Sequence, residues 1–429
     1  MLDIALIREN PARVRELCHQ KNVDAPIDMI LELDQRRRNL IGEVERIKAL
    51  RNAGSRTIGR TRDDTERQQL VAEMGGLGDQ IAVLDVQLRE VEADLHDLML
   101  GVPNLPDPDV PIGPTAESNV VHLQKGQLPT FDFTPRPHWE IAEELGIIDF
   151  ERGVKIAGTR GYVMVGDGAR LQRALVTWML DVHTLQHHYT EVIPPHLVLG
   201  ESLVGTGNLP KFADTLFRDI EEDKWLIPTA EVPITNLYRD EIVPESALPI
   251  YHTAATQCFR REQMSGGRDV RGIKRVFEFQ KVELVKFTHP ERSEEELQTL
   301  LNEALAIVEG LGLPYRVLDL STGDMTFSSA HTYDIEAWAP GSDEWLEISS
   351  CSLFRDYQAR RANVRFRPAG GGRPQLLHTL NGSGLALPRT IIAILENFQL
   401  QDGSVSIPQV LQPYMGGQKT IGRPNRESV

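Results

Sequence analysis

Two interleaved seven-residue repeats of apolar residues restrict the fold of this chain more than any other feature. They are clearest after residue 69, at Leu70, Leu77, Leu84, Val91 and Leu98, and at Met74, Ile81, Leu88 and Leu95. A weaker form precedes them, at Ile30, Arg37, Val44, Arg51 and Ile58, and at Leu33, Leu40, Ile47 and Gly54. Spacings that alternate between three and four residues are typical of a coiled-coil seam. The pattern predicts two long helices that fold back as an antiparallel hairpin over about residues 27–100.

The far end of this hairpin is basic, although the chain as a whole has a net charge of −16. Residues 46–62 contain no acidic residue and six cations, namely Arg46, Lys48, Arg51, Arg56, Arg60 and Arg62. A basic tip on an acidic protein predicts an anionic partner, most simply the backbone of a nucleic acid. A spacer or dimerisation element is the alternative. Arg37 and Arg51 at seam positions cost stability and Gly54 weakens the helix, so we expect the outer part of the arm to be mobile.

A proline-rich segment ends the helical region. Residues 101–114, GVPNLPDPDVPIGP, contain five prolines, which cannot continue a helix. We expect a semi-rigid linker here. The predicted domains are an N-terminal domain over residues 1–100, this linker, and a mixed α and β domain over residues 115–429.

Composition places the chain among ordinary globular proteins, with 25% charged and 41% hydrophobic residues in 429. An apolar run near 18 residues, as a membrane-spanning helix requires, does not occur. The N-terminus lacks the features of a signal peptide. The three cysteines, Cys18, Cys258 and Cys351, are far apart, which favours a reducing cytoplasm over a disulfide framework or a cysteine zinc site.

Residues 258–287 combine arginines, carboxylates and aromatic residues in one stretch. Apolar and polar residues alternate over residues 275–283, which predicts a strand, and a Gly-Gly-Arg-Asp run predicts a loop before it. We therefore expect two antiparallel strands joined by a long basic loop. Arginines at the strand ends could bind phosphate bidentately, while Glu283 and Phe279 could bind an amine and a base. A charged surface hairpin is the alternative.

The other predicted strands also occur in hairpins and between long insertions, without a regular βαβ rhythm, which predicts a mostly antiparallel sheet flanked by helices. Five segments follow in order: HYTEVIPP ending at Pro195, TAE at 229–231, FRREQMSGGRDVRGIKRVFEFQKVE, EISSCS at 347–352 and NGSGLALPRT at 381–390. Together they resemble the motifs of class II aminoacyl-tRNA synthetases, and within that class the bacterial-type seryl-tRNA synthetases. The resemblance covers nearly the whole chain.

This resemblance implies an α+β fold, a class II antiparallel sheet flanked by helices and preceded by an antiparallel helical coiled-coil arm. It implies ATP-dependent activation of L-serine to seryl-adenylate and transfer to the 3′ end of tRNA(Ser), with tRNA(Sec) as a second candidate acceptor. The arm would contact the long variable arm of the tRNA. A cytoplasmic homodimer is expected, and the apolar residues 171–180 are a candidate part of its interface. Mg²⁺ would accompany ATP.

The resemblance also assigns roles to individual residues. ATP contacts are implied for Arg260, Glu262, Val276, Phe279, Glu347, Ser350 and Arg389. Serine contacts are implied for Thr229, Glu231, Arg260, Glu283 and Ser383. The catalytic residues would be Arg260, which bridges the serine carboxylate and the α-phosphate, and Arg389, which sandwiches the base with Phe279. Mg²⁺ would be held by Glu347 and Ser350, because it prefers oxygen ligands.

Alternatives remain open for both residues and function. Glu283 could pair within its strand, Phe279 could be sheet core, and Ser383 could satisfy a loop turn. Glu347 could be a solvated edge carboxylate, and Arg389 could cap or pair locally on its helix. The chain departs from the family pattern at Arg261, at Gln263-Met264 and at Phe277-Glu278, which leaves the contacts of this loop to the tRNA undefined. A ligase that loads a carrier protein generally lacks the long arm. A non-catalytic RNA-binding paralogue would be expected to lose Arg260, Glu283, Glu347 or Arg389, and all four are present.

Overall fold

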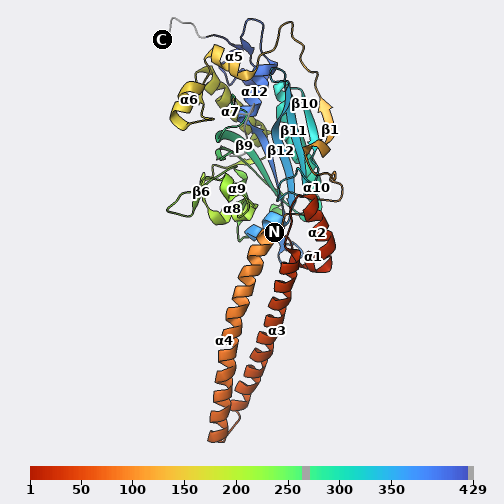
Figure 1. Ribbon diagram of the computed structural model, residues 1–429, viewed down its shortest axis with the longest axis vertical. Coiled ribbons are helices and arrows are strands. Elements are labelled where there is room, and N and C mark those ends of the chain that lie inside the picture. Colours follow the sequence, from red (N-terminus) through yellow and green to blue (C-terminus); the bar gives the residue numbers. More distant parts are fainter. Residues whose placement is uncertain (263–270, 424–429) are drawn as a thin grey trace. The chain divides into compact units, whose positions relative to one another are not determined.

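The computed structural model describes residues 1–262 and 271–423, which form two compact units, Met1–Pro103 and Asn104–Val429 (Figure 1). The predicted basic loop, with Gln263 and Met264, lies outside the described residues except for Arg271. Within the described part of the chain, no helix has both the length and the apolar composition needed to cross a membrane.

The first unit is helical. Its helices are α1 (Ile4–Glu9), α2 (Pro11–Gln20), α3 (Ile27–Ile58) and α4 (Asp64–Leu100). Helix α4 begins where the Asp63 side chain accepts a hydrogen bond from the Glu66 backbone N–H, 2.8 Å away. The two long helices lie side by side (Figure 1), and the predicted seam is their contact surface, with Ile30, Leu40, Val44, Ile47, Ile81, Val91 and Leu95 buried. The predicted coiled-coil arm is confirmed.

Two seam positions that seemed unfavourable have specific partners. Arg37 donates from Nη2 to the carboxylate of buried Asp34, 2.9 Å away, so its charge on the seam is paired. At Gly54, a Cβ atom would lie 2.2 Å from the Met74 sulfur. The glycine therefore leaves room for the Met74 side chain to pack against the opposite helix. This effect is separate from the low helix propensity of glycine.

The second unit is built on a large sheet. In the described residues eight strands form it, in the order β1-β10-β11-β12-β15-β9-β8-β4. Their bounds are β1 (Val120–Lys125), β4 (Thr190–Glu191), β8 (Ile250–Phe259), β9 (Glu278–Thr288), β10 (Tyr315–Asp319), β11 (His331–Ala339), β12 (Glu344–Arg355) and β15 (His378–Ala386). All neighbouring pairs are antiparallel except β4 with β8. The predicted fold class is confirmed.

The larger helices of this unit cover one face of the sheet (Figure 1), and two short helices contact the other face. The larger ones are α5 (His138–Leu145), α7 (Asp167–Leu185), α10 (Ser293–Leu311) and α12 (Leu387–Asn397). On β9, Val282 and Leu284 belong to the hydrophobic core shared with these helices, and Lys286 pairs with Glu296 and Glu303 of α10. Successive side chains of a strand point to opposite faces, so Lys281 and Glu283 lie on the other face. That face carries the candidate site.

Shorter elements surround the sheet. The remaining helices are α6 (Phe150–Ala157), α8 (Gly200–Thr206), α9 (Glu231–Thr235) and α11 (Tyr357–Ala362). The short strands are β2 (Ile148–Asp149), β3 (Val163–Met164), β5 (Leu197–Leu199), β6 (Lys224–Leu226), β7 (Ile242–Pro244), β13 (Arg365–Arg367), β14 (Gln375–Leu376), β16 (Val405–Ser406) and β17 (Thr420–Ile421). They add four small sheets to the large one within residues 1–262 and 271–423.

The strand predicted over residues 275–283 begins at Glu278, three residues later than expected. Its partner strand β8 ends at Phe259, which pairs with Glu278, so residues 275–277 have no strand beside them. One backbone hydrogen bond, from Arg260 N–H to the Phe277 carbonyl at 2.9 Å, continues the contact.

Candidate active site on the face of the sheet opposite the large helices

Glu283 is the centre of a buried polar pocket on β9. Thr229 donates its hydroxyl hydrogen to Glu283 Oε2 at 2.8 Å, and the Lys281 ammonium pairs with the same carboxylate. Ser383 on β15 is the cross-strand partner of Glu283 and therefore shares its face. Among the described residues, the buried Oε1 of Glu283 has no hydrogen-bond partner. The pocket can accept a hydrogen bond that the described residues leave unmade.

A second buried carboxylate, Glu231 at the start of α9, lies beside Glu283. Burial and the charge of Glu283 raise the pKa of Glu231 to about 7, against the opposing effect of a hydrogen bond from Gln358. That bond, from Gln358 Nε2 to Glu231 Oε1, is 2.6 Å long, and Thr379 donates to the amide oxygen of Gln358 at 2.7 Å. An ammonium group placed between the carboxylates would favour their charged forms.

Arg260 extends this pocket toward the end of β8. Its guanidinium lies 5.2 Å from the centre of the Phe279 ring, and its Nε donates to the Pro228 carbonyl at 3.3 Å. Arg260 is also close enough to lower the pKa of Glu231 through its charge. The structure therefore brings Arg260 together with both the predicted base-stacking residue and the predicted serine residues.

Glu262 stands at the start of the loop, with a backbone φ of 46°. Its carboxylate lies 3.5 Å from the Arg275 guanidinium, and its carbonyl accepts a hydrogen bond from Arg160. Val276 is buried in the hydrophobic core, so any ligand contact from it must come from its backbone.

Sequence reasoning missed some members of this constellation. Arg275 was predicted only as one of the arginines at the strand ends, and its pairing with Glu262 was not foreseen. Lys281 was visible two residues before Glu283, a spacing that places both side chains on one face. Gln358 carried no such signal, because its contact with Glu231 spans 127 residues.

A β-bulge on β12 brings Glu347 and Ser350 to the same face. Three residues apart, these side chains would point to opposite faces of a regular strand. The pairing with β11 shifts, however, so that Ile335 faces Ser349 while Glu336 faces Glu347, and Ile348 is the extra residue. Asp334 faces Ser350 and lies two residues from Glu336, so both predicted cation ligands share the Asp334 face.

The groups on this face suit a hard cation, because they are carboxylate and hydroxyl oxygens. Burial and the charge of Glu347 raise the pKa of Asp334 well above its ordinary value, while a hydrogen bond with Ser350 opposes that shift. Arg389 at the start of α12 lies 3.1 Å from the Glu347 carboxylate and donates to the Glu347 carbonyl at 2.8 Å. The residues present therefore fit Mg²⁺ together with an anionic ligand.

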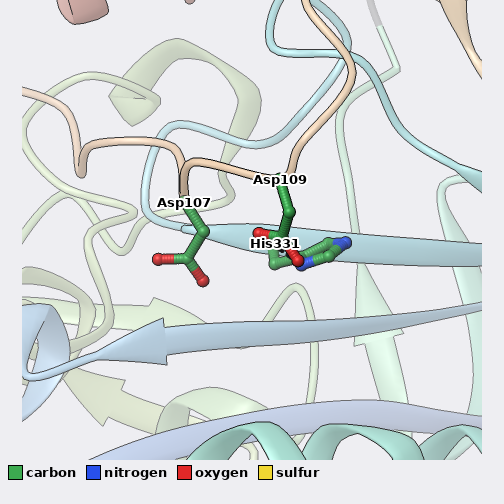
Figure 2. Close-up of side chains that lie close together, drawn as sticks. All are labelled: Asp107, Asp109 and His331. Carbon is green, nitrogen blue, oxygen red and sulfur yellow. Dashed lines mark ion pairs between the residues drawn. The ribbon is translucent and has the colours of Figure 1, made fainter.

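A second carboxylate cluster, Asp107, Asp109 and His331, also brings candidate ligand atoms within 4.8 Å of one another (Figure 2). Its negative charge is already balanced by protein cations. Asp107 accepts hydrogen bonds from Nε and Nη2 of Arg355. Burial would lower the pKa of His331, but the hydrogen bond to Asp319 at 3.0 Å and the surrounding carboxylates raise it overall. We regard this cluster as an ion-pair network.

The two described departures from the family pattern point away from the pocket. Arg261 lies with its guanidinium 5.5 Å from the centre of the Phe217 ring, and its backbone N–H donates to the Thr215 carbonyl. Phe277 and Glu278 line a separate cavity of about 280 Å³ with Arg160, Tyr162 and neighbouring residues of α6 and β3.

The six cations predicted at the tip of the arm all lie in the outer part of α3 or just after it. Arg46, Lys48, Arg56, Arg60 and Arg62 are exposed and Arg51 is half-buried. Lys48 lies 3.7 Å from Asp85 of α4, which partly neutralises it.

Comparisons with known proteins cover both units. Residues 213–398 match the family model "tRNA synthetase class II core domain (G, H, P, S and T)", and residues 1–106 match "Seryl-tRNA synthetase N-terminal domain". A serine–tRNA ligase of Thermomicrobium roseum is 61% identical over 423 residues, which are 99% of this chain and 95% of that protein.

Solved structures of seryl-tRNA synthetases superpose on this chain. Seryl-tRNA synthetase from Pyrococcus horikoshii, complexed with ATP, superposes with a TM-score of 0.93 at 33% identity, covering 99% of this chain and 100% of that one. The cytoplasmic serine-tRNA ligase from Naegleria fowleri, in complex with AMP, gives 0.88 at 31% identity, covering 99% of each chain. With relatives of this similarity over its full length, the chain belongs to the seryl-tRNA synthetase family of class II aminoacyl-tRNA synthetases.

Proposed function

We propose that this protein activates L-serine with ATP to form seryl-adenylate and transfers the seryl group to the 3′ end of tRNA(Ser). The observation that carries the proposal is the buried pocket around Glu283. Thr229, Ser383 and Glu231 surround this carboxylate, and Arg260 lies at the pocket's edge. The pocket offers negative charge for an ammonium group and a guanidinium for a carboxylate, which are the two charged ends of an amino acid.

In the first step an oxygen of the serine carboxylate attacks the α-phosphorus of ATP, and the bond to pyrophosphate breaks. In the second step a ribose hydroxyl of the terminal nucleotide attacks the seryl carbonyl carbon, and AMP leaves. Such reactions depend on positioning and charge neutralisation. Arg260 orients the serine carboxylate and neutralises the α-phosphate, while Phe279 and Arg389 hold the adenine between a ring and a guanidinium.

Mg²⁺ is the cation proposed to accompany ATP. When bound, it would neutralise phosphate charge and fix the phosphate geometry. Glu347 and Ser350 would hold it, because their oxygens share one face of β12. Arg389 contacts Glu347 and is therefore placed to neutralise the nucleotide beside the cation.

Serine would be selected by its hydroxyl group. Glu283 presents a buried Oε1 that has no hydrogen-bond partner among the described residues, and Ser383 lies opposite. Alanine would leave this oxygen unpaired, so a site of this kind rejects it strongly. Threonine carries an additional methyl group and must be rejected by size.

The basic arm would bind the tRNA. Its exposed cations attract phosphates. A protein with a net negative charge needs a local basic patch of this kind to bind a nucleic acid. The long variable arm of tRNA(Ser) is the proposed contact. tRNA(Sec) is the second proposed acceptor, and charging assays with both transcripts would test it. We place the reaction in the cytoplasm, which suits the three free, buried cysteines.

A homodimer is part of the proposal, although the predicted apolar helix does not supply its surface. Leu171, Leu175 and Met179 of α7 are buried in the core of their own chain. Exposed apolar side chains occur farther on, because Leu185 and Ile193 are 75% and 90% exposed. We therefore propose that exposed apolar residues around β4 are buried against a second copy of the chain. A monomeric mass in sedimentation experiments would contradict the dimer.

One paired assay tests the function. ATP–pyrophosphate exchange is expected with serine and not with alanine or threonine, and bulk tRNA is expected to be charged with serine. Absence of serine-dependent exchange would contradict the enzyme and favour the non-catalytic paralogue. Exchange without tRNA charging would favour the ligase that loads a carrier protein.

A further inference from the structure

Asp334 belongs to the face that carries the proposed cation ligands, although no motif assigns it a role. It lies on β11 directly opposite Ser350 of β12, and Glu336, two residues along, lies opposite Glu347. Cross-strand partners share a face, and so do residues two apart on one strand. Asp334, Glu336, Glu347 and Ser350 therefore project from the same side of the sheet.

Two of the three carboxylates on this face have arginine partners. Glu336 pairs with Arg316 of β10, and Glu347 pairs with Arg389 of α12. Asp334 has a buried Oδ1 atom with no hydrogen-bond partner in the described part of the chain. An unpaired buried carboxylate oxygen is costly, and proteins usually retain one where it meets a cation or a ligand.

Ser350 lies directly opposite Asp334 on the same face, so its hydroxyl can reach this carboxylate, which gives Asp334 a specific task. A neutral serine hydroxyl can offer a lone pair to a cation only if its hydrogen points elsewhere. A carboxylate that accepts this hydrogen fixes the orientation of the hydroxyl and makes its oxygen a better donor. Outer partners of this kind tune the ligands of metal sites in general.

We propose that Asp334 is a positioning residue of the cation site, which accepts the Ser350 hydrogen and, when the cation is bound, adds a negative charge behind it. The inference rests on the proposed function, because it takes Glu347 and Ser350 as the ligands of the cation that accompanies ATP. Asp334 acts through Ser350 and does not itself touch the nucleotide.

The test measures binding of Mn²⁺ in the presence of ATP, by the loss of the free Mn²⁺ signal in electron paramagnetic resonance. Asp334→Asn keeps the size and an acceptor oxygen but removes the charge. Its dissociation constant for Mn²⁺ is expected to rise by about tenfold or more, the usual effect of removing an outer partner. The matched control is Glu336→Gln, on the same strand and face, which should leave Mn²⁺ binding within about twofold of the wild type.

A double variant separates positioning from a general charge effect. If Asp334 acts through Ser350, Asp334→Asn should add little further loss to Ser350→Ala, so the two effects are not additive. Wild-type Mn²⁺ binding by Asp334→Asn would overturn the inference, and so would full additivity or an equal loss in Glu336→Gln.

Folding and the proposed function are checked independently. Metal-free Asp334→Asn is expected to unfold at or above the wild-type temperature, because it lacks a buried charge. If Asp334→Asn unfolds at a lower temperature than the wild type, Mn²⁺ binding by the double variant and by Ser350→Ala still shows whether Asp334 acts through Ser350. Absence of serine-dependent exchange in the wild type would refute the proposed function alone, since the Mn²⁺ measurement does not depend on serine.

Discussion

Ser383 and Glu283 face each other as cross-strand partners of β15 and β9, with Thr229 hydrogen-bonded to the same carboxylate at 2.8 Å. This relationship brings three segments that are far apart in the chain to one buried carboxylate. The proposed recognition of the serine hydroxyl rests on this arrangement.

Glu283→Ala is expected to abolish serine-dependent ATP–pyrophosphate exchange, with a loss on the order of hundredfold or more in kcat/KM for serine. The change removes the acceptor for the hydroxyl and a charge that faces the ammonium group. Glu278→Gln is a matched control, because this exposed carboxylate lies on the opposite face of the same strand. Near wild-type exchange by Glu283→Ala would refute the assignment of the pocket.

Serine binding should depend on pH through Glu231. Its pKa is raised to about 7 by burial and by Glu283, so part of this carboxyl is protonated at neutral pH before serine binds. Affinity for serine should therefore fall as the pH drops below about 7, because a protonated carboxyl no longer attracts the ammonium group. Calorimetric titrations from pH 5.5 to 8 would measure this. Glu231→Gln should bind more weakly and with a flatter pH profile; an unchanged profile would exclude Glu231 as its source.

The tip of the arm should matter for tRNA and not for adenylate formation. Deleting about residues 46–67 is expected to leave serine-dependent exchange intact and to destroy aminoacylation. Replacing Arg56, Arg60 and Arg62 by Glu should raise the KM for tRNA by more than about tenfold and flatten its salt dependence. Glu43 and Glu45, nearer the root of α3, offer control replacements by Gln. A deletion variant that charges tRNA normally would contradict the proposed contact.

Glycines in the arm should differ in their tolerance of a side chain. At Gly75 and Gly76 a Cβ atom meets nothing within 4 Å, whereas at Gly54 it would push the Met74 sulfur aside. Alanine at Gly75 or Gly76 is therefore expected to stabilise α4 by about 1 kcal/mol each, and alanine at Gly54 to gain less. Hydrogen exchange of the arm amides would measure this. Equal gains at all three positions would show that Met74 adapts without cost.

His331 should make stability depend on pH. Its pKa is raised by Asp319, Asp109 and Asp107 despite burial, with Arg355 nearby on Asp107. Because the pKa of His331 is higher in the folded state, its protonation stabilises the fold. This stabilisation is complete at pH values below the pKa in the unfolded state, about 6.5, and is lost as the pH rises through the pKa in the folded state. Denaturant unfolding should therefore show a decline in the free energy of unfolding above pH about 6.5. Comparison with His331→Gln isolates this contribution, and parallel curves for the two proteins would contradict it.

Local sequence patterns predicted what depends on neighbouring residues. The arm follows from a spacing of three and four residues, which a helix turns into one apolar stripe. The hairpin of β8 and β9 follows from alternation and from the loop residues between them, although β9 starts at Glu278 because β8 has ended by then. The candidate site residues were predicted from motifs that resemble a family, and their residue types suit phosphate, ammonium and hydroxyl groups.

The tertiary structure alone decided which of these residues meet. Alternation would separate Glu347 and Ser350, and only the shifted register between β11 and β12 places them on one face with Asp334. Gln358 reaches Glu231 across 127 residues, and Arg389 reaches Glu347 across 42. The sequence by itself determined the elements and the chemistry of their side chains, because backbone periodicity is local. Convergence depends on strand register and packing between distant segments, which no local spacing encodes.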